Sequence, residues 1–171
     1  PGFVFSGKEN RVDMNTVTLN LQDDFGPQKI LELWQPNIGL RAVVVIDNIA
    51  CGPAVGGVRM APDVDVAEVA RLARAMSYKN ASAGLAYGGG KAGIVADPDC
   101  DADEKEVLIR AFAHEIRDLD EYIPGPDMGT DETCMAWIQD EIGRAVGLPR
   151  VLGGIPLDEI GATGYGLAIA A

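Results

Sequence analysis

Two lysines and one aspartate stand in surroundings that suit amino-acid chemistry. Lys79 ends a Met-Ser-Tyr-Lys segment, Lys91 follows the three glycines at 88–90, and Asp127 lies in the proline- and glycine-rich stretch 124–129. An ammonium group can bind a carboxylate, and a partly desolvated amine close to a second ammonium has a lowered pKa and can act as a base near neutral pH. A carboxylate in a rigid loop can exchange a proton with an amine. Together the three residues predict a site that holds an amino acid and moves protons.

Each of these residues also has a purely structural interpretation. A lysine near a helix end commonly complements the helix dipole, and consecutive glycines commonly form a turn. Asp127 could cap the helix that follows it, although Thr130 and Asp131 are equally able to do so. The combination favours chemistry, because glycine lets the backbone approach a ligand closely beside Lys91.

Four partial motifs lack the residues that their chemistry needs. The stretch 85–92 has neither the first glycine nor the hydroxyl of a phosphate-binding loop, and 80–84 has no first glycine for a nucleophile elbow. The stretch 164–166 lacks the third glycine and the preceding strand of a dinucleotide fingerprint. His114 is the single histidine, so no metal site is predicted.

Composition restricts the partners and the compartment. The 171 residues can make one domain of ordinary size, and their net charge of -12 repels nucleic acid and anionic lipid. No apolar run approaches the roughly 20 residues that span a bilayer. The three cysteines are widely spaced, which fits neither a disulfide framework nor a zinc site. We therefore expect a cytoplasmic protein without nucleic-acid or membrane partners.

The apolar pattern and the turn signals predict an α/β order. Segments 29–34 and 40–47 favour a hairpin, because turn residues separate two runs rich in Ile, Leu and Val. Asp65 should cap a helix that carries Lys79 near its end. Three more helices are expected at 103–119, from Thr130 or Asp131 to Gly147, and from 161 onward. Two strands complete the order, a buried one at 91–96 with Lys91 at its entrance and a short one at 122–123.

Four motifs in this order resemble the N-terminal domain of the glutamate/leucine/phenylalanine/valine dehydrogenases, over about residues 25–171. They are GPAVGGVRM at 52–60, RLARAMSYKN at 71–80, GGGK at 88–91 and PDMGT at 126–130. The resemblance implies a three-layer α/β/α domain with a mixed sheet. It also implies a parent enzyme that reversibly converts an L-amino acid to a 2-oxo acid and ammonia with NAD or NADP.

The resemblance assigns a role to each candidate residue. Lys91 would activate water for attack on the imine carbon, Asp127 would exchange protons with the amino group, and Lys79 would hold the substrate α-carboxylate. The substrate site would also be lined by Gly56, Gly57 and Met60. Thr163 would lie near the nicotinamide.

Val55 and Gly125 bear on the substrate's side chain. Relatives that act on glutamate carry a lysine where Val55 stands, and a valine cannot pair with a carboxylate. Gly125 resembles a pocket wall without a side chain, which leaves room for a bulky group. We therefore expect an apolar substrate, with leucine, valine and phenylalanine all open. Glutamate is the alternative, because the stretches 126–127 and 161–166 look more like the glutamate branch.

The resemblance divides the chain into an N-terminal arm or helix at 1–24, a substrate-binding and oligomerisation domain at 25–157, and the start of an interdomain helix at 158–171. The family's Rossmann-type domain, which binds most of the NAD or NADP, is not part of these 171 residues. The chain alone is thus expected to be inactive and to form a homo-oligomer, with the hairpin at 29–47 as a candidate interface. The alternative is a truncated, non-catalytic module for oligomerisation or amino-acid binding.

Overall fold

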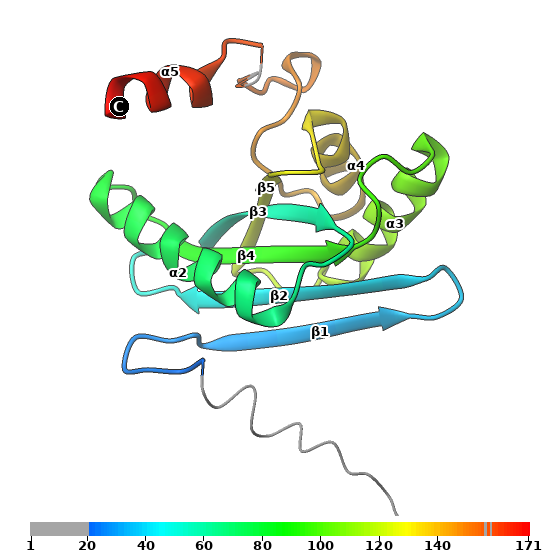
Figure 1. Ribbon diagram of the computed structural model, residues 1–171, viewed down its shortest axis with the longest axis horizontal. Helices are drawn as coiled ribbons and strands as arrows, with labels where there is room; N and C mark the ends of the chain where they lie inside the picture. The colour runs from blue at the N-terminus through cyan, green and yellow to red at the C-terminus, as the bar shows by residue number, and fades with distance from the viewer. Residues whose placement is uncertain (1–20, 156, 158) are drawn as a thin grey trace, which may run out of the picture.

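A mixed five-stranded sheet forms the centre of the protein in the computed structural model, which describes residues 21–155, 157 and 159–171 (Figure 1). The strand order is β1-β2-β4-β3-β5. The strands are β1 (Lys29–Gln35), β2 (Leu40–Asn48), β3 (Ala54–Ala61), β4 (Gly88–Val95) and β5 (Tyr122–Pro126). The helices are α2 (Val66–Ser82), α3 (Ala102–Glu115), α4 (Glu132–Ile142) and α5 (Ala162–Ala170), with a 3-10 turn, η1, at Arg150–Leu152.

Helices cover both faces of the sheet, which confirms the three-layer α/β/α prediction. On one face, α2 packs over β2 and β4 around a small core that includes Val45, Val69 and Ala73. The larger core lies on the other face, where α3 and α4 pack side by side (Figure 1). Because α2 covers β2 and β4 more than β3 and β5, it leaves the β3 and β5 part of its own face open.

The strand directions follow from the connections. β1 and β2 form the predicted hairpin, in antiparallel register from Lys29 opposite Ile46 to Gln35 opposite Leu40. β2 also runs antiparallel to β4. β3 is parallel to β4 and to β5, because a helix connects each of these strands to the next. The carboxyl ends of β3, β4 and β5 therefore lie at the same edge of the sheet.

The glycines before Lys91 belong to a strand and do not form a turn. β4 begins at Gly88, so Lys91 lies in the middle of the strand and not at its entrance, as its sequence context had suggested. The reason is packing: a Cβ at Gly89 would collide with the backbone of Ser77 in α2. Only glycine allows the helix to approach the strand this closely. The three glycines before Lys91 therefore form regular sheet, although glycine has a low strand propensity.

Two helices end earlier than their apolar patterns predict. α3 stops at Glu115, four residues before Leu119. α4 is capped by Asp131, whose side chain accepts a hydrogen bond from the backbone N–H of Cys134, and ends at Ile142. Gly143 follows with a φ of 71°, a left-handed conformation that terminates the helix before Gly147. The prediction that this helix would run to Gly147 was wrong.

Arg144 holds the end of α3 from a distance in the sequence. Its guanidinium donates hydrogen bonds to four backbone carbonyls, those of Ile116 at 2.6 Å and of Arg117, Leu119 and Tyr122 at 3.1 Å each. Carbonyls at a helix C-terminus have no partner within the helix, and a cation there also complements the helix dipole. Arg144 thus fixes the connection from α3 to β5, the strand that leads to Asp127.

Replacing Arg144 with methionine should lower the free energy of unfolding by about 2 to 3 kcal/mol, because hydrogen bonds from a charged group to partly buried carbonyls are lost. Urea denaturation of the 171-residue chain measures the change. The matched control is Arg150→Met, because Arg150 is exposed and, among the described residues, its side chain pairs only with the exposed Glu159; its effect should stay within about 0.5 kcal/mol. Equal midpoints for the two variants would contradict the capping role.

Residues 1–20, most of the expected N-terminal arm at 1–24, lie outside the described residues. Within the described part of the chain, none of the helices has the length and apolar character to cross a membrane.

Candidate active site

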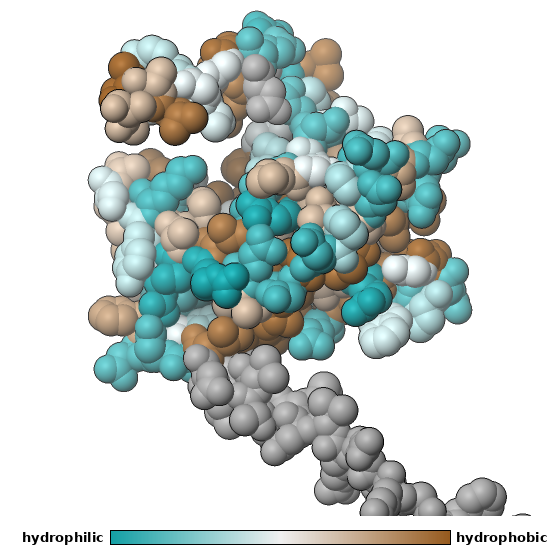
Figure 2. Space-filling view, in the orientation of Figure 1, coloured by the Kyte–Doolittle hydropathy of each residue, from teal (hydrophilic) through white to brown (hydrophobic). Residues whose placement is uncertain are grey.

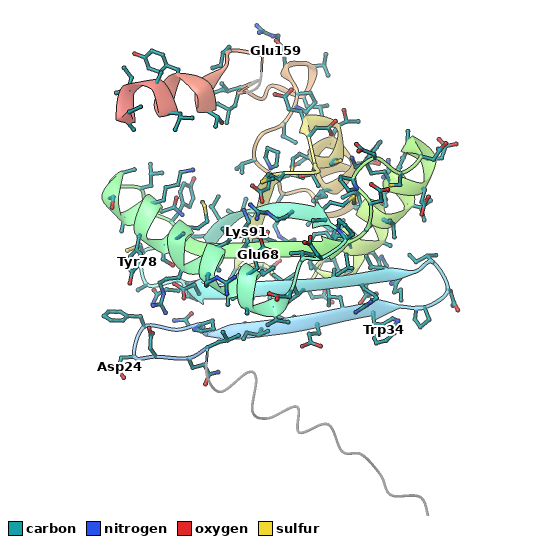
Figure 3. The ribbon with its side chains drawn as sticks, viewed as in Figure 1. Asp24, Trp34, Glu68, Tyr78, Lys91 and Glu159 are labelled. Atoms are coloured by element: carbon teal, nitrogen blue, oxygen red, sulfur yellow. The ribbon has the colours of Figure 1, made fainter. Side chains whose placement is uncertain are left out.

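A buried ion pair lies on the open part of the α2 face of the sheet. Lys91 of β4 is only 5% exposed, and its Nζ lies 2.8 Å from Oδ2 of Asp127, which directly follows β5. Figure 3 shows Lys91 near the middle of the sheet. The two strands are not neighbours, because β3 runs between them. The side chains of Lys91 and Asp127 therefore meet above β3.

β3 lets the pair form because it has a glycine at the crossing point. A Cβ at Gly57 would lie 2.7 Å from Cβ of Asp127 and 3.2 Å from Nζ of Lys91. Both distances are shorter than ordinary contacts, so any side chain at this position would push the pair apart. Gly56, by strand alternation, belongs to the opposite face with Ala54 and Val58, and its carbonyl accepts a hydrogen bond from the hydroxyl of Tyr122 at 2.9 Å. On the face of the pair, β3 has no side chain at Gly57.

A third charged group joins the pair from β3. Nε of Arg59 lies 2.9 Å from the same Oδ2 of Asp127, and its Nη1 lies 2.5 Å from Oε1 of Glu68 in the first turn of α2. Burial by itself would raise the pKa of the Asp127 carboxyl, but the hydrogen bonds and charges of Lys91 and Arg59 outweigh it and hold that pKa below its usual value. Asp127 is therefore a carboxylate at neutral pH.

Lys79 and Val55 lie toward the other end of the same face. Lys79 follows Glu68 by about three helical turns, so both side chains leave α2 on one side, the side that reaches β3 through Arg59. The end of α2 is fixed over the start of β4, because Nδ2 of Asn80 donates a hydrogen bond to the carbonyl of Gly88 at 2.6 Å. Val55 is at that end as well and shares a face with Arg59, four residues along β3. Lys79 is exposed and forms no ion pair with any described residue.

Two of the expected site residues, Met60 and Gly125, are placed differently, whereas Thr163 lies on the helix that was expected to carry it. Met60 is buried in the core under α3 and α4, so its side chain points away from the face that carries Lys91. Thr163 is exposed on α5, which stands apart from the sheet and presents an apolar surface (Figure 2). Gly125 does lie next to Gly57, but a Cβ there would be 3.0 Å from Cγ2 of Val146. The room expected above Gly125 is thus partly taken by Val146.

Three residues at or near the site had no site role in the sequence interpretation. No strand was expected at 54–61, so Arg59 had no predicted place on a sheet face. In the structure, alternate residues of β3 share a face, and Arg59 stands two residues after Gly57. Glu68 lies in the first turn of α2, where its carboxylate binds Arg59 while Asp65 accepts the hydrogen bond from its backbone N–H. Val146 follows α4, and no local pattern in the sequence indicates that it lies against Gly125.

The arrangement suits proton transfer to or from a small molecule bound beside Lys91 and Asp127. A buried lysine next to a carboxylate can hold or release a proton, whereas Arg59 stays protonated and can only donate hydrogen bonds. Gly57 of β3 places no side chain between Lys91 and Asp127. Within the described residues, no three His, Cys, Asp or Glu side chains are grouped so as to hold a metal ion.

Comparisons with known proteins agree on one family. The model of the Glu/Leu/Phe/Val dehydrogenase dimerisation domain matches residues 29–144. The glutamate dehydrogenase of Aeropyrum pernix is 40% identical over 136 residues, which cover 72% of this chain and 32% of that protein. The phenylalanine dehydrogenase of Bacillus thermotolerans is 40% identical over 124 residues, which cover 70% of this chain and 32% of that protein.

Solved structures give the same result. The hetero-hexameric glutamate dehydrogenase of Thermus thermophilus, crystallised with leucine bound, matches with a TM-score of 0.70 and 35% sequence identity. The match covers 76% of this chain and 36% of that one. The chain therefore spans about a third of the length of the relatives that it matches.

Proposed function

Because this chain belongs to the Glu/Leu/Phe/Val dehydrogenase family, we propose that it forms the substrate-binding part of an enzyme that oxidises an L-amino acid. The reaction takes the amino acid, water and NAD or NADP in its oxidised form to a 2-oxo acid, ammonia, a proton and the reduced coenzyme. The observation that carries this proposal is the buried pair of Lys91 and Asp127 above Gly57 of β3.

Each charged side chain has a distinct task in this proposal. Lys91, once deprotonated, takes a proton from the water that attacks the imine carbon. Asp127 accepts and returns the proton of the amino group, because its lowered pKa keeps it ionised and able to accept. Lys79, exposed at the end of α2, binds the α-carboxylate of the substrate as a flexible point charge.

The coenzyme would accept the hydride that leaves Cα, and this chain would contribute little to holding it. Thr163 is the one candidate for the nicotinamide side, and we propose that a separate nucleotide-binding domain supplies the rest. The apolar, exposed side chains of α5 support this, because Tyr165, Leu167 and Ile169 are each about 70% exposed and need a covering partner.

Self-association is a further part of the proposal. β1 is at one edge of the sheet, and within the described residues its outer edge pairs with no other strand. The exposed Trp34 lies on this strand (Figure 3). The guanidinium of Arg41 lies over its ring. An uncovered edge strand of this length favours pairing with another copy.

The substrate's side chain should be apolar. Val55 lies on the face of Lys91 and cannot pair with a carboxylate, so we expect kcat/KM of the complete enzyme to be at least about 100-fold lower for glutamate than for the best of leucine, valine and phenylalanine. Val55→Lys should raise kcat/KM for glutamate about tenfold or more. Steady-state kinetics with the four amino acids side by side measures both effects.

Val107→Lys is the matched control, because Val107 is exposed on α3, on the opposite side of the sheet. It should leave the ratio of the four substrates unchanged. The alternative is that the enzyme is a glutamate dehydrogenase, which the relatives from Aeropyrum pernix and Thermus thermophilus favour. If glutamate is the best substrate of the unaltered protein, that alternative is right and Val55 does not control the pocket.

A further inference from the structure

Two cations from different strands converge on one oxygen of Asp127. Nζ of Lys91 and Nε of Arg59 lie 2.8 Å and 2.9 Å from Oδ2. Within the described residues, Oδ1 accepts no hydrogen bond. The two oxygens of this carboxylate are therefore in different surroundings: Oδ2 contacts two cations, and Oδ1 is available to accept a hydrogen bond.

Arg59 is held at both ends of its guanidinium. Its Nη1 binds Oε1 of Glu68 at 2.5 Å, and the backbone N–H of Glu68 is in turn fixed by Oδ1 of Asp65 at 2.7 Å. Asp127 is fixed as well, because its backbone N–H donates a hydrogen bond to Oγ1 of Thr130 at 3.0 Å. The planar fork of an arginine holds two carboxylates in fixed directions, whereas a lysine ammonium is a point charge with rotatable donors that fixes neither direction.

We propose that Arg59 is a positioning residue for Asp127: it binds Oδ2, and so leaves Oδ1 as the oxygen that meets the substrate's amino group. Glu68 sets the direction of the guanidinium from α2. The part that concerns the amino group rests on the proposed function, whereas the part that concerns the ionisation of Asp127 does not. Arg59 never transfers a proton in this proposal, because it acts only through Asp127.

The charges around Asp127 decide what the loss of Arg59 would do. Lys91 faces it from β4 and Arg59 from β3, Glu68 of α2 reaches it only through Arg59, and the Tyr122 hydroxyl lies on the other face of the sheet. Without Arg59, a half-buried carboxylate would keep a single cation. Since burial raises the pKa of a carboxyl and each nearby cation lowers it, the pKa of Asp127 should rise.

If Arg59 had only a structural role, it would hold β3 to α2 through Glu68 and would not affect the pKa of Asp127. The pKa of Asp127 therefore distinguishes a structural role from a positioning role. The measurement is an NMR titration of the Asp127 carboxyl carbon in the 171-residue chain, unaltered and as Arg59→Gln, Arg59→Lys and Arg41→Gln. Arg41 is the matched control, because its guanidinium lies over Trp34 on the β1 and β2 hairpin.

Arg59→Gln should raise the apparent pKa of Asp127 by about 1 unit or more, Arg59→Lys should recover part of that shift, and Arg41→Gln should leave it unchanged. The Nε–H signal of Arg59 in the unaltered chain should also change with the same midpoint as Asp127. This second measurement decides the matter even if Arg59→Gln does not fold. An unchanged pKa in folded Arg59→Gln, or an Nε–H signal that ignores the titration of Asp127, would overturn the proposal.

The complete enzyme then tests the link to catalysis. The acidic limb of its pH profile of kcat/KM should move to higher pH in Arg59→Gln, by the same amount as the pKa measured by NMR. Arg59→Lys should show a smaller change. If the NMR shift occurs but the profile does not move, Arg59 still sets the ionisation of Asp127 and the proposed proton transfer by Asp127 is wrong. Failure of the inference and failure of the proposed function are thus distinct results.

Discussion

Replacing Lys91 with alanine should lower kcat of the complete enzyme about 100- to 10,000-fold, the range that a general acid or base contributes. Lys91 is buried against Asp127, and the other cation at that oxygen, Arg59, stays protonated and cannot act as a base. The loss should appear in kcat at saturating amino acid and coenzyme, while coenzyme binding changes little. Steady-state kinetics with both substrates varied measures this.

Lys79→Ala is the companion variant. Lys79 is exposed, and a contact with the substrate's carboxylate exists in the ground state and the transition state alike, so its loss should act mainly on KM. Circular dichroism must show that both variants fold, because Lys91→Ala leaves Asp127 with one cation fewer. Near-normal turnover of folded Lys91→Ala would remove Lys91 from the mechanism.

Asp47→Ala should be the most destabilising single change, with a loss of about 3 to 5 kcal/mol, because it breaks a buried ion pair by removing one partner. Asp47 of β2 is 1% exposed. Its carboxylate accepts two hydrogen bonds from Nε of Arg74, at 2.9 Å and 3.0 Å, and one from the hydroxyl of Ser77 at 2.5 Å. Arg74 also binds Asp23, so the same cluster holds the turn before β1 against α2.

Urea denaturation of the 171-residue chain measures the loss. Asp63→Ala is the matched control, since Asp63 is exposed and no described side chain binds it; the change should stay within about 0.5 kcal/mol. A loss below about 1 kcal/mol for Asp47→Ala would mean that water replaces the carboxylate and that the cluster does not hold the sheet to α2.

Much of the fold could be predicted from local signals. The hairpin turn at 35–39 and the cap at Asp65 act within a few residues, and both are present in the structure. The ends of α3 and α4 could not be predicted as well. α3 ends where Arg144 can reach carbonyls from 25 or more residues away, and α4 ends at Ile142, before Gly143, although apolar residues continue to Val146.

The site shows the same division. Lys91 and Asp127 could be singled out because each stands among glycines or prolines, which are unusual neighbours for a charged side chain that only faces solvent. Their separation by one strand could not be predicted, because the glycine triplet looked like a turn and is sheet. Arg59 could not be placed either, because no strand was expected at 54–61, where the structure has β3. The contact of Val146 with Gly125 depends on a return of the chain that no local pattern encodes.

The glycines under the site limit how this pocket can evolve. At Gly57 and Gly89 any added carbon meets the pair or the helix, so mutations there cost stability before they alter selectivity. Variation that survives must come from the rim, where Val55 and Val146 have room to change. A laboratory library for new amino-acid substrates would therefore randomise these two valines and leave the glycine positions untouched.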